Sequence, residues 1–151
     1  MPHIHEKIDF TAEALIVYAG KVLLRMHDKY DLWLGVGGHI ELNEDPNEAV
    51  RREAKEEVGL SIKLIGEGKD WGDGRRDLIP PRFLNRHRID GGHEHISMIY
   101  FAVADTDQVA PSGSDRSDNW KWFTAEELAD PKYGILPSIR HYAEAALREV
   151  E

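Results

Sequence analysis

Three glutamates lie close together in the segment EAKEEV, at positions 53, 56 and 57. On a helix, Glu53 pairs with Glu57 at i,i+4 and with Glu56 at i,i+3, so all three fall within an arc of about 100°. Like charges at these spacings slightly destabilise an isolated helix. A divalent cation that prefers oxygen ligands, such as Mg²⁺ or Mn²⁺, would neutralise the cluster. The alternative is a solvated acidic face, partly offset by Arg51, Arg52 and Lys55.

The residues around the glutamates predict a helix from Pro46 to Val58. Asp45 is a favourable N-cap, proline suits the first helical position, and Glu48 completes a capping box. Gly59 follows the last turn, where a left-handed residue is favoured. An apolar stripe at i,i+4 spacing, which we expect to face a core, is formed by Val50, Ala54 and Val58. The glutamates border this stripe, so a cation bound there would lie in a cleft at the edge of the packed layer.

The wider spacing decides between a metal site and a solvated face. The segment Gly38–Leu60 fits the pattern G-x5-E-x7-R-E-U-x-E-E-x-G-U, where U is apolar, at all nine fixed positions. This segment resembles the Nudix box, the signature of the Nudix hydrolases. A match at so many positions is far more specific than a short glycine motif.

The resemblance implies a Nudix-type α/β/α sandwich, with a mixed β-sheet and helices on its faces. It also implies a metal-dependent pyrophosphohydrolase that cleaves a nucleoside diphosphate linked to another moiety X by attack of water on phosphorus. Arg52 is expected to hold a carboxylate in place by a charge-assisted hydrogen bond, and Glu44 to orient the loop or a water. The expected ligands of Mg²⁺ (or Mn²⁺) are the Gly38 carbonyl and the carboxylates of Glu53, Glu56 and Glu57.

The general base is expected either in the box or on a later loop. On that loop we prefer Glu94, because Gly91 and Gly92 before it can act as a hinge that swings a carboxylate towards the site. His93 and His95 are alternative bases. The competing interpretation is that both histidines flank an exposed strand start and have no role.

The candidate substrate-binding residues lie outside the box. Arg25, at the end of a predicted strand, is a candidate phosphate contact, and an ordinary exposed strand residue is an equally good interpretation. Trp71, Arg75 and Arg76 combine an aromatic ring with guanidinium groups, which suits a nucleobase and its phosphates. The alternative is that these three residues only pack their loop onto the sheet.

Composition limits the class of protein. A chain of 151 residues is expected to form one domain, residues 1–151. The net charge of −9 argues against broad electrostatic binding to nucleic acid, and the longest apolar runs are too short to span a bilayer. The absence of cysteine fits a reducing, cytoplasmic location. The expected partner is a small nucleotide-like diphosphate, and a homodimer is left open.

The remaining elements are predicted from apolar patterning. Strands are expected at 12–18, 21–26, 32–37, 61–66, 95–104 and 120–123, and helices opening at Thr124 and Pro137. Residues 1–9 are expected to be a polar lead-in, in which His3 and His5 are better explained by a mobile terminus than by a metal pair. Residues 69–92 are expected to be mostly loop with one short strand.

Three rival functions follow from the same pattern. A Nudix-fold binding or sensor domain without catalysis is the main alternative, but such domains usually lose box carboxylates and this chain keeps all of them. The isomerase branch of the fold relies on a cysteine, which this chain lacks. RNA decapping is disfavoured by the negative net charge.

Overall fold

The computed structural model describes residues 7–111 and 119–150, and its centre is a mixed eight-stranded sheet. The main path of this sheet runs β10-β2-β1-β9-β5, with β3 on β2, β4 on β1 and β8 on β9. The strands of this sheet are β1 (Ile8–Tyr18), β2 (Lys21–His27), β3 (Leu32–Leu34), β4 (Val36–His39), β5 (Ile62–Leu64), β8 (Phe83–Asp90), β9 (His93–Ala104) and β10 (Trp120–Phe123). The helices are α1 (Pro46–Val58), α2 (Ala125–Leu128) and α3 (Pro137–Glu149).

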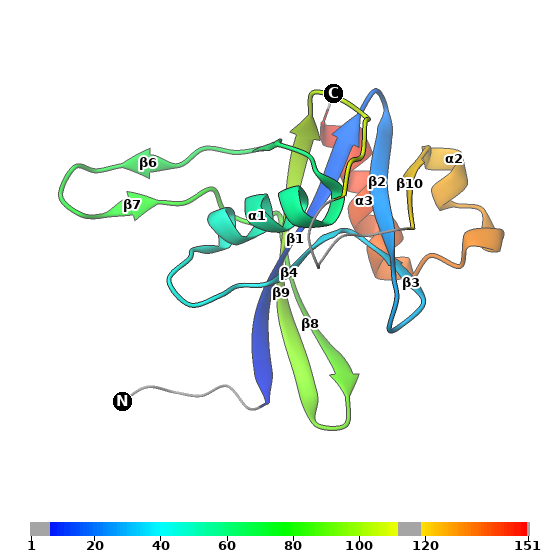
Figure 1. Ribbon diagram of the computed structural model, residues 1–151, viewed down its shortest axis with the longest axis horizontal. Helices are drawn as coiled ribbons and strands as arrows, with labels where there is room; N and C mark the ends of the chain where they lie inside the picture. The colour runs from blue at the N-terminus through cyan, green and yellow to red at the C-terminus, as the bar shows by residue number, and fades with distance from the viewer. Residues whose placement is uncertain (1–6, 112–118, 151) are drawn as a thin grey trace.

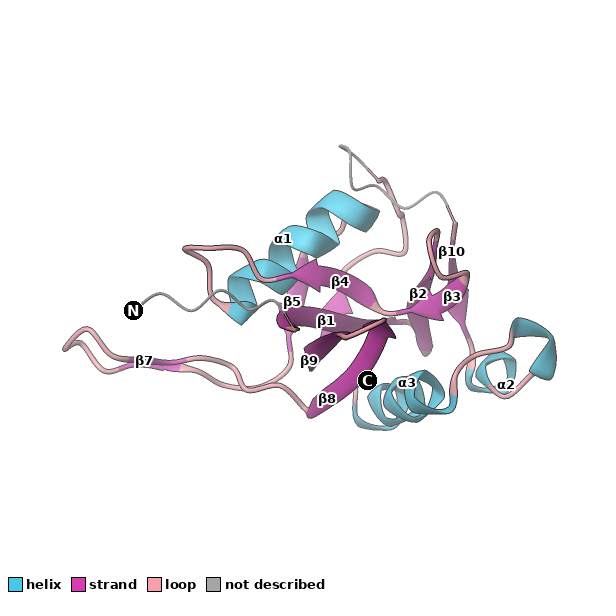
Figure 2. Ribbon diagram, turned by 90° about the horizontal axis from the view of Figure 1, so that it is seen from below, coloured by secondary structure: helices cyan, strands magenta, loops and turns pink. Residues whose placement is uncertain are grey.

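The long parallel pair of β1 and β9 forms the middle of the sheet. Its register runs from Ile8 opposite Glu94 to Val17 opposite Val103. Because side chains alternate along a strand, one face of this pair packs under α1 and the other under α3. Figure 2 shows α1 and α3 on opposite sides of the sheet, which confirms the predicted α/β/α sandwich. No helix in the described parts of the chain is long and apolar enough to cross a membrane.

Helix α1 has the predicted bounds and caps. The Asp45 side chain accepts a hydrogen bond from the Glu48 backbone N–H, and the Glu48 side chain accepts one from the Asp45 N–H. Gly59 ends the helix at φ 69°, and a Cβ atom there would lie 1.9 Å from the Ala110 carbonyl oxygen. Both the backbone conformation and this close approach therefore require glycine at the C-terminal end of α1.

Residues 69–92 are more ordered than the sequence predicts. They contain β6 (Lys69–Asp70) and β7 (Arg76–Asp77), which form a narrow hairpin that projects away from the sheet (Figure 1). They also contain the whole of β8, which pairs with β9. The expectation of a loop was wrong because β8 forms a hairpin with β9 across Gly91 and Gly92, and this pairing supplies its hydrogen bonds.

Two strand boundaries also differ from the prediction. The lead-in expected at residues 1–9 was too long, because β1 already begins at Ile8, where it pairs with β9. The single strand expected at 32–37 is interrupted at Gly35 and continues as β4. The proposed pair His3 and His5 lies outside the described residues.

Candidate metal and substrate site

Helix α1 presents Glu53 and Glu57 in its buried face and Glu56 towards solvent. Glu57 is only 4 % exposed and Glu53 8 %, whereas the Glu56 side chain is 39 % exposed. Glu57 Oε1 accepts a hydrogen bond of 2.7 Å from the Gly37 backbone N–H. Glu57 Oε2 lies in ion-pair contact with Arg25 Nε. Burial nevertheless raises the pKa of Glu57 to about 8, so the single guanidinium does not compensate for the lost solvation of this carboxylate.

Arg52 joins the box loop to the helix. Its Nε and Nη2 atoms donate to the two oxygens of Glu44 at 3.0 and 2.8 Å, a bidentate pair that lowers the pKa of Glu44. Its Nη1 atom donates to Glu53 Oε1 at 3.1 Å and to Glu56 Oε2 at 3.2 Å. Its Nη2 atom also donates to the His39 carbonyl at 3.1 Å. Arg52 therefore orients two box carboxylates, and Glu44 orients Arg52.

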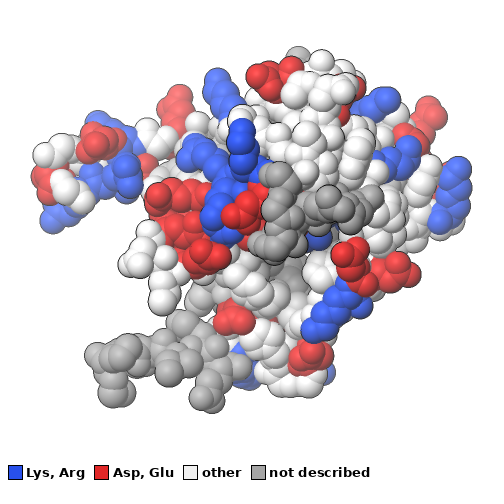
Figure 3. Space-filling view, in the orientation of Figure 1, with Lys and Arg blue, Asp and Glu red and all other residues white. Residues whose placement is uncertain are grey.

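Gly38 lets the β4 backbone approach these carboxylates. A Cβ atom on Gly38 would lie 2.6 Å from Glu53 Oε1, so a side chain there would collide with the carboxylate. The three box carboxylates are held by different partners, Glu57 by Gly37 and Arg25, and the other two by Arg52. Carboxylate oxygens and a backbone carbonyl such as that of Gly38 are the hard donor set that Mg²⁺ takes. The residues present therefore fit the metal that the box implies. Figure 3 shows acidic side chains gathered over α1, with basic side chains beside them.

The family follows from a match over most of the chain. Residues 11–142 match the NUDIX domain. The chain belongs to the NUDIX family. It is 35 % identical to a NUDIX hydrolase from Clostridium perfringens, with a TM-score of 0.85 over 95 % of this chain and 98 % of that one. It is 31 % identical to an RNA pyrophosphohydrolase from Bartonella clarridgeiae, over 74 % of this chain and 70 % of that protein.

A more distant solved structure confirms the fold alone. The E. coli dihydroneopterin triphosphate pyrophosphohydrolase is 18 % identical, with a TM-score of 0.68 over 93 % of this chain and 96 % of that one. Together with the family match, the close relatives show that this chain is a Nudix hydrolase acting on pyrophosphate bonds. This finding favours the enzyme over the binding-domain alternative.

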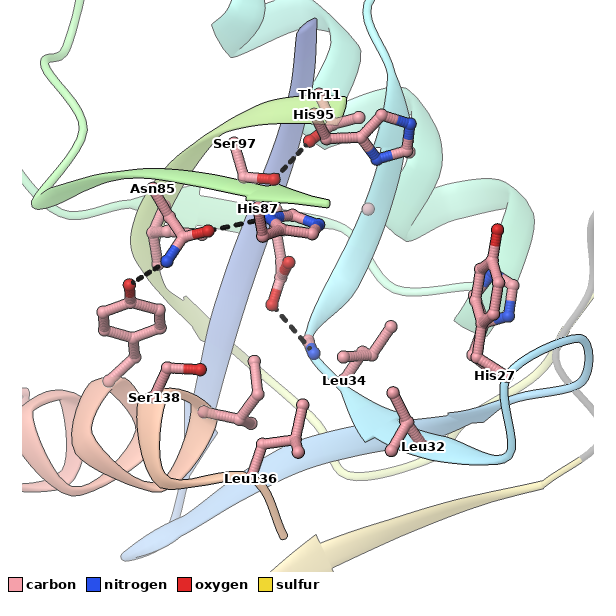
Figure 4. Close-up of a pocket in the computed structure, with 18 of the residues that line it drawn as sticks. Thr11, His27, Leu32, Leu34, Asn85, His87, His95, Ser97, Leu136 and Ser138 are labelled. Atoms are coloured by element: carbon pink, nitrogen blue, oxygen red, sulfur yellow. Dashed lines mark hydrogen bonds between the residues drawn. The ribbon is translucent and has the colours of Figure 1, made fainter. Parts of the chain in front are cut away.

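A cavity of about 400 Å³ adjoins β4 on the side of the sheet that faces α3 (Figure 4). Gly37, Gly38 and Arg25 form the wall nearest the box. Deeper in, Asn85 donates to the Tyr142 hydroxyl at 2.9 Å and its Oδ1 lies 2.7 Å from His87 Nδ1. Leu32, Leu34, Leu136 and Ile139 supply an apolar wall. The cavity thus combines apolar surface with a few oriented polar groups, as small-molecule sites do.

Glu13 and His27 are among the polar cavity residues that the sequence did not predict. Glu13 is half-buried, and its Oε1 accepts a hydrogen bond of 3.0 Å from the Gly35 N–H. Burial raises the pKa of Glu13. His27 stacks on Tyr30 at 4.8 Å between ring centroids, and its buried Nδ1 atom has no hydrogen-bond partner among the described residues. The sequence signal that could have identified Glu13 is that it is a lone glutamate within an apolar strand.

Three of the four predicted substrate-binding residues do not line this cavity. Arg25 lines the cavity, but Trp71, Arg75 and Arg76 belong to the projecting β6–β7 hairpin, and none of them lines it. Trp71 is 53 % exposed, and Arg75 pairs at 3.0 Å with Asp73 in the same hairpin. The hairpin carries charges of both signs and stands clear of the sheet (Figures 1 and 3). None of the three therefore reaches the cavity, although Arg76 Nη2 lies 3.9 Å from Asp45 Oδ2 at the start of the box helix.

Glu94 lies in β9, not on a hinged loop. Gly91 and Gly92 form the tight turn of the β8–β9 hairpin, in which Asp90 pairs with His93. Glu94 pairs with Ile8 of β1, and Gly38 pairs with Ala12 of the same strand. Their partners are four residues apart, so Glu94 and Gly38 are separated by about 13 Å along β1. Both Glu94 oxygens accept hydrogen bonds from Arg86, at 2.8 and 2.9 Å. The expectation of a mobile carboxylate beside the box was wrong, because the sheet and Arg86 hold Glu94 in place.

The Arg86–Glu94 pair predicts a pH-dependent contribution to stability. Hydrogen bonds from Arg86 lower the pKa of Glu94 to about 2, from an ordinary value of 4.5. A carboxyl group whose pKa is lowered on folding stabilises the fold at pH values above its unfolded pKa. This stabilisation is lost as pH falls through its folded pKa. Arg86→Gln is therefore expected to lower Tm at pH 6, and this deficit should shrink as pH falls from about 4.5 towards 2.

Thermal denaturation of both proteins across this pH range measures the effect. Arg148→Gln removes the same charge from α3 and serves as the control, for which no such convergence is expected. A deficit of Arg86→Gln that stays constant from pH 6 to pH 3 would contradict the assignment.

Proposed function

We propose that this Nudix hydrolase is metal-dependent and cleaves a nucleotide-like diphosphate that lies along β4, with moiety X in the cavity. One observation carries the proposal. The Gly37 N–H bonds to Glu57 on the α1 side of the sheet, while Gly37 and Gly38 also line the cavity. The two glycines of β4 therefore separate the box carboxylates from the cavity. A phosphate chain crossing this strand would reach both.

The box residues would hold the metal. The proposed ligands of Mg²⁺ (or Mn²⁺) are Glu53, Glu56, Glu57 and the Gly38 carbonyl. When bound, the ion supplies charge neutralisation at the phosphates and activation of water. Arg52 keeps two of the carboxylates oriented. Arg25 is placed between Glu57 and the Gly37 carbonyl, to which its Nη2 donates at 3.4 Å, so its guanidinium can also contact a phosphate oxygen.

The general base is better sought in the box than at Glu94. A base must come within hydrogen-bond reach of the water it activates, directly or through one further water. Glu56 lies beside the proposed phosphate path and is 39 % exposed, so solvent water reaches it. A role for Glu94 stays a prediction, which its position and its pairing with Arg86 disfavour.

The cavity suits an aromatic group as moiety X. The His27–Tyr30 stack and the leucine wall offer ring and apolar contacts, and Asn85 offers an oriented amide. A nucleobase has both a flat face and a polar edge. The RNA pyrophosphohydrolase from Bartonella clarridgeiae adds a second candidate, a phosphorylated RNA, which would also present a base and phosphates.

A substrate screen with and without metal tests the proposal. Nucleoside triphosphates, nucleotide sugars, dinucleotides and 5′-triphosphorylated RNA would be compared by release of phosphate or pyrophosphate. We expect turnover of at least one nucleotide with Mg²⁺ or Mn²⁺, loss of that turnover in excess chelator, and recovery when the metal is restored. Undiminished turnover in excess chelator would overturn the metal mechanism.

A further inference from the structure

A second cluster of metal-ligating side chains lies where β1 and β9 begin, away from the box carboxylates. Asp9 Oδ2 is 2.9 Å from His93 Nε2, and ligand atoms of Asp9, His93 and His95 all lie within 4.8 Å of one another. His39 Nε2 is 3.7 Å from the same Asp9 oxygen. Four side chains from three strands thus converge on one small volume.

The sheet register builds this cluster. Asp9 of β1 pairs directly with His95 of β9, and Thr11, two residues further along β1, pairs with His39 of β4. Residues two apart on a strand share a face, so His93 and His95 point to the same side as Asp9 and His39. The cluster is therefore fixed by backbone pairing and does not depend on a flexible loop.

His95 is the centre of a group of imidazole rings. Its ring centroid lies 5.0 Å from that of His39, 5.4 Å from that of His93 and 5.6 Å from that of His87. His87 is itself oriented by the amide of Asn85. A carboxylate among imidazoles is the nitrogen-rich donor set of Zn²⁺ and its neighbours, whereas Mg²⁺ selects oxygen donors.

We propose that Asp9, His93 and His95 bind a transition-metal ion of the Zn²⁺ class, with His39 as the fourth ligand. Around a tetrahedral Zn²⁺ ion, ligand atoms at 2.0–2.2 Å lie about 3.4 Å apart. The observed separations of 2.9 and 3.7 Å from Asp9 Oδ2 bracket that value. Small side-chain rotations therefore complete the site.

This site is separate from the box but borders the cavity. It shares no ligand with the proposed Mg²⁺ site, although His39 follows Gly38 in the box, and Asp9 lies three residues, or about 10 Å along β1, from Ala12, the partner of Gly38. His39 and His95 line the cavity. An ion held there would tie the ends of β1, β4 and β9 together at the cavity rim. The ordinary alternative is that the cluster consists only of His–Asp hydrogen bonds and ring contacts.

Metal titration of the full-length, tag-free protein in excess Mg²⁺ distinguishes a metal site from a cluster of hydrogen bonds and ring contacts. Mg²⁺ fills oxygen sites, so added Co²⁺ or Zn²⁺ reports the nitrogen-rich site. We expect one Co²⁺ per chain with the visible absorption bands of a tetrahedral complex, and one Zn²⁺ per chain by calorimetry. Both signals should be lost in the double variant His93→Asn with His95→Asn.

Matched variants control for other sites. The double variant His3→Asn with His5→Asn removes as many histidines and should keep the ion, and so should Glu56→Gln with Glu57→Gln in the box. Zn²⁺ should raise the Tm of the wild-type protein and leave that of the His93/His95 variant unchanged. Should that variant fail to fold, Asp9→Asn is expected to weaken Zn²⁺ binding at least about tenfold. Retention of the ion by all cluster variants, or no ion bound by the wild type, would overturn the proposal.

Discussion

Replacing Glu57 with Gln is expected to lower kcat at least about a hundredfold, equivalent to about 2.7 kcal/mol in the activation barrier. Gln has the same size, and its carbonyl oxygen can still accept the hydrogen bond from the Gly37 N–H. It cannot supply the negative charge that faces Arg25 and would hold the metal. The same loss is expected for Glu56→Gln, which removes a carboxylate oriented by Arg52.

Steady-state kinetics in saturating Mg²⁺ measure this effect, and calorimetric titration with Mn²⁺ separates loss of metal from loss of chemistry. Glu67→Gln removes the same charge from an exposed loop position and should turn over like the wild type. Circular dichroism should show folded protein in every case. Wild-type turnover by both box variants would mean that the acidic face of α1 is only a solvated surface.

The box helix could be predicted because its determinants are local. The capping pair Asp45 and Glu48, the terminal Gly59 and the apolar stripe all lie within one short segment, and each does in the structure what its chemistry predicts. Spacing along the helix also placed Glu53 and Glu57 beside the buried stripe. It did not reveal how unequal the carboxylates are, because the burial of Glu57 depends on β4 and on Arg25 from β2.

The cavity could not be predicted, because it is assembled by strand pairing over long sequence separations. Thr11 and Ser97 are hydrogen-bonded at 2.6 Å across 86 positions of sequence, and the same β1–β9 register brings Asp9 to His95. The composition of residues 69–92 predicts a loop, so it gives no sign that Asn85 and His87 lie in a strand that lines the cavity. The arginines and tryptophan of the β6–β7 hairpin were favoured on composition alone, which carries no information about the direction in which a hairpin projects.

Gly38→Ala is expected to lower kcat about a hundredfold, the usual cost of moving a site group by about 1 Å. The added Cβ atom would lie 2.6 Å from Glu53 Oε1 and 2.8 Å from its Cδ atom. These atoms are the end of a side chain, so the collision should be relieved by displacing the carboxylate while β4 stays in place. Affinity for Mn²⁺, measured by calorimetry, should fall together with kcat.

Two other glycines, Gly37 of β4 and Gly92 of the β8–β9 turn, make this prediction specific to the carboxylate. Gly37→Ala would place its Cβ atom 2.1 Å from the Ala12 carbonyl oxygen, a collision with backbone that should lower Tm strongly because β4 would have to separate from β1. Gly92→Ala meets nothing within 4 Å and should leave both Tm and kcat unchanged. Gly38→Ala should keep a Tm near that of Gly92→Ala and yet lose turnover. If Gly38→Ala instead turned over like the wild type, the position of Glu53 against β4 would not matter for catalysis. The Gly38 carbonyl and the Glu53 carboxylate would then not share a metal ion.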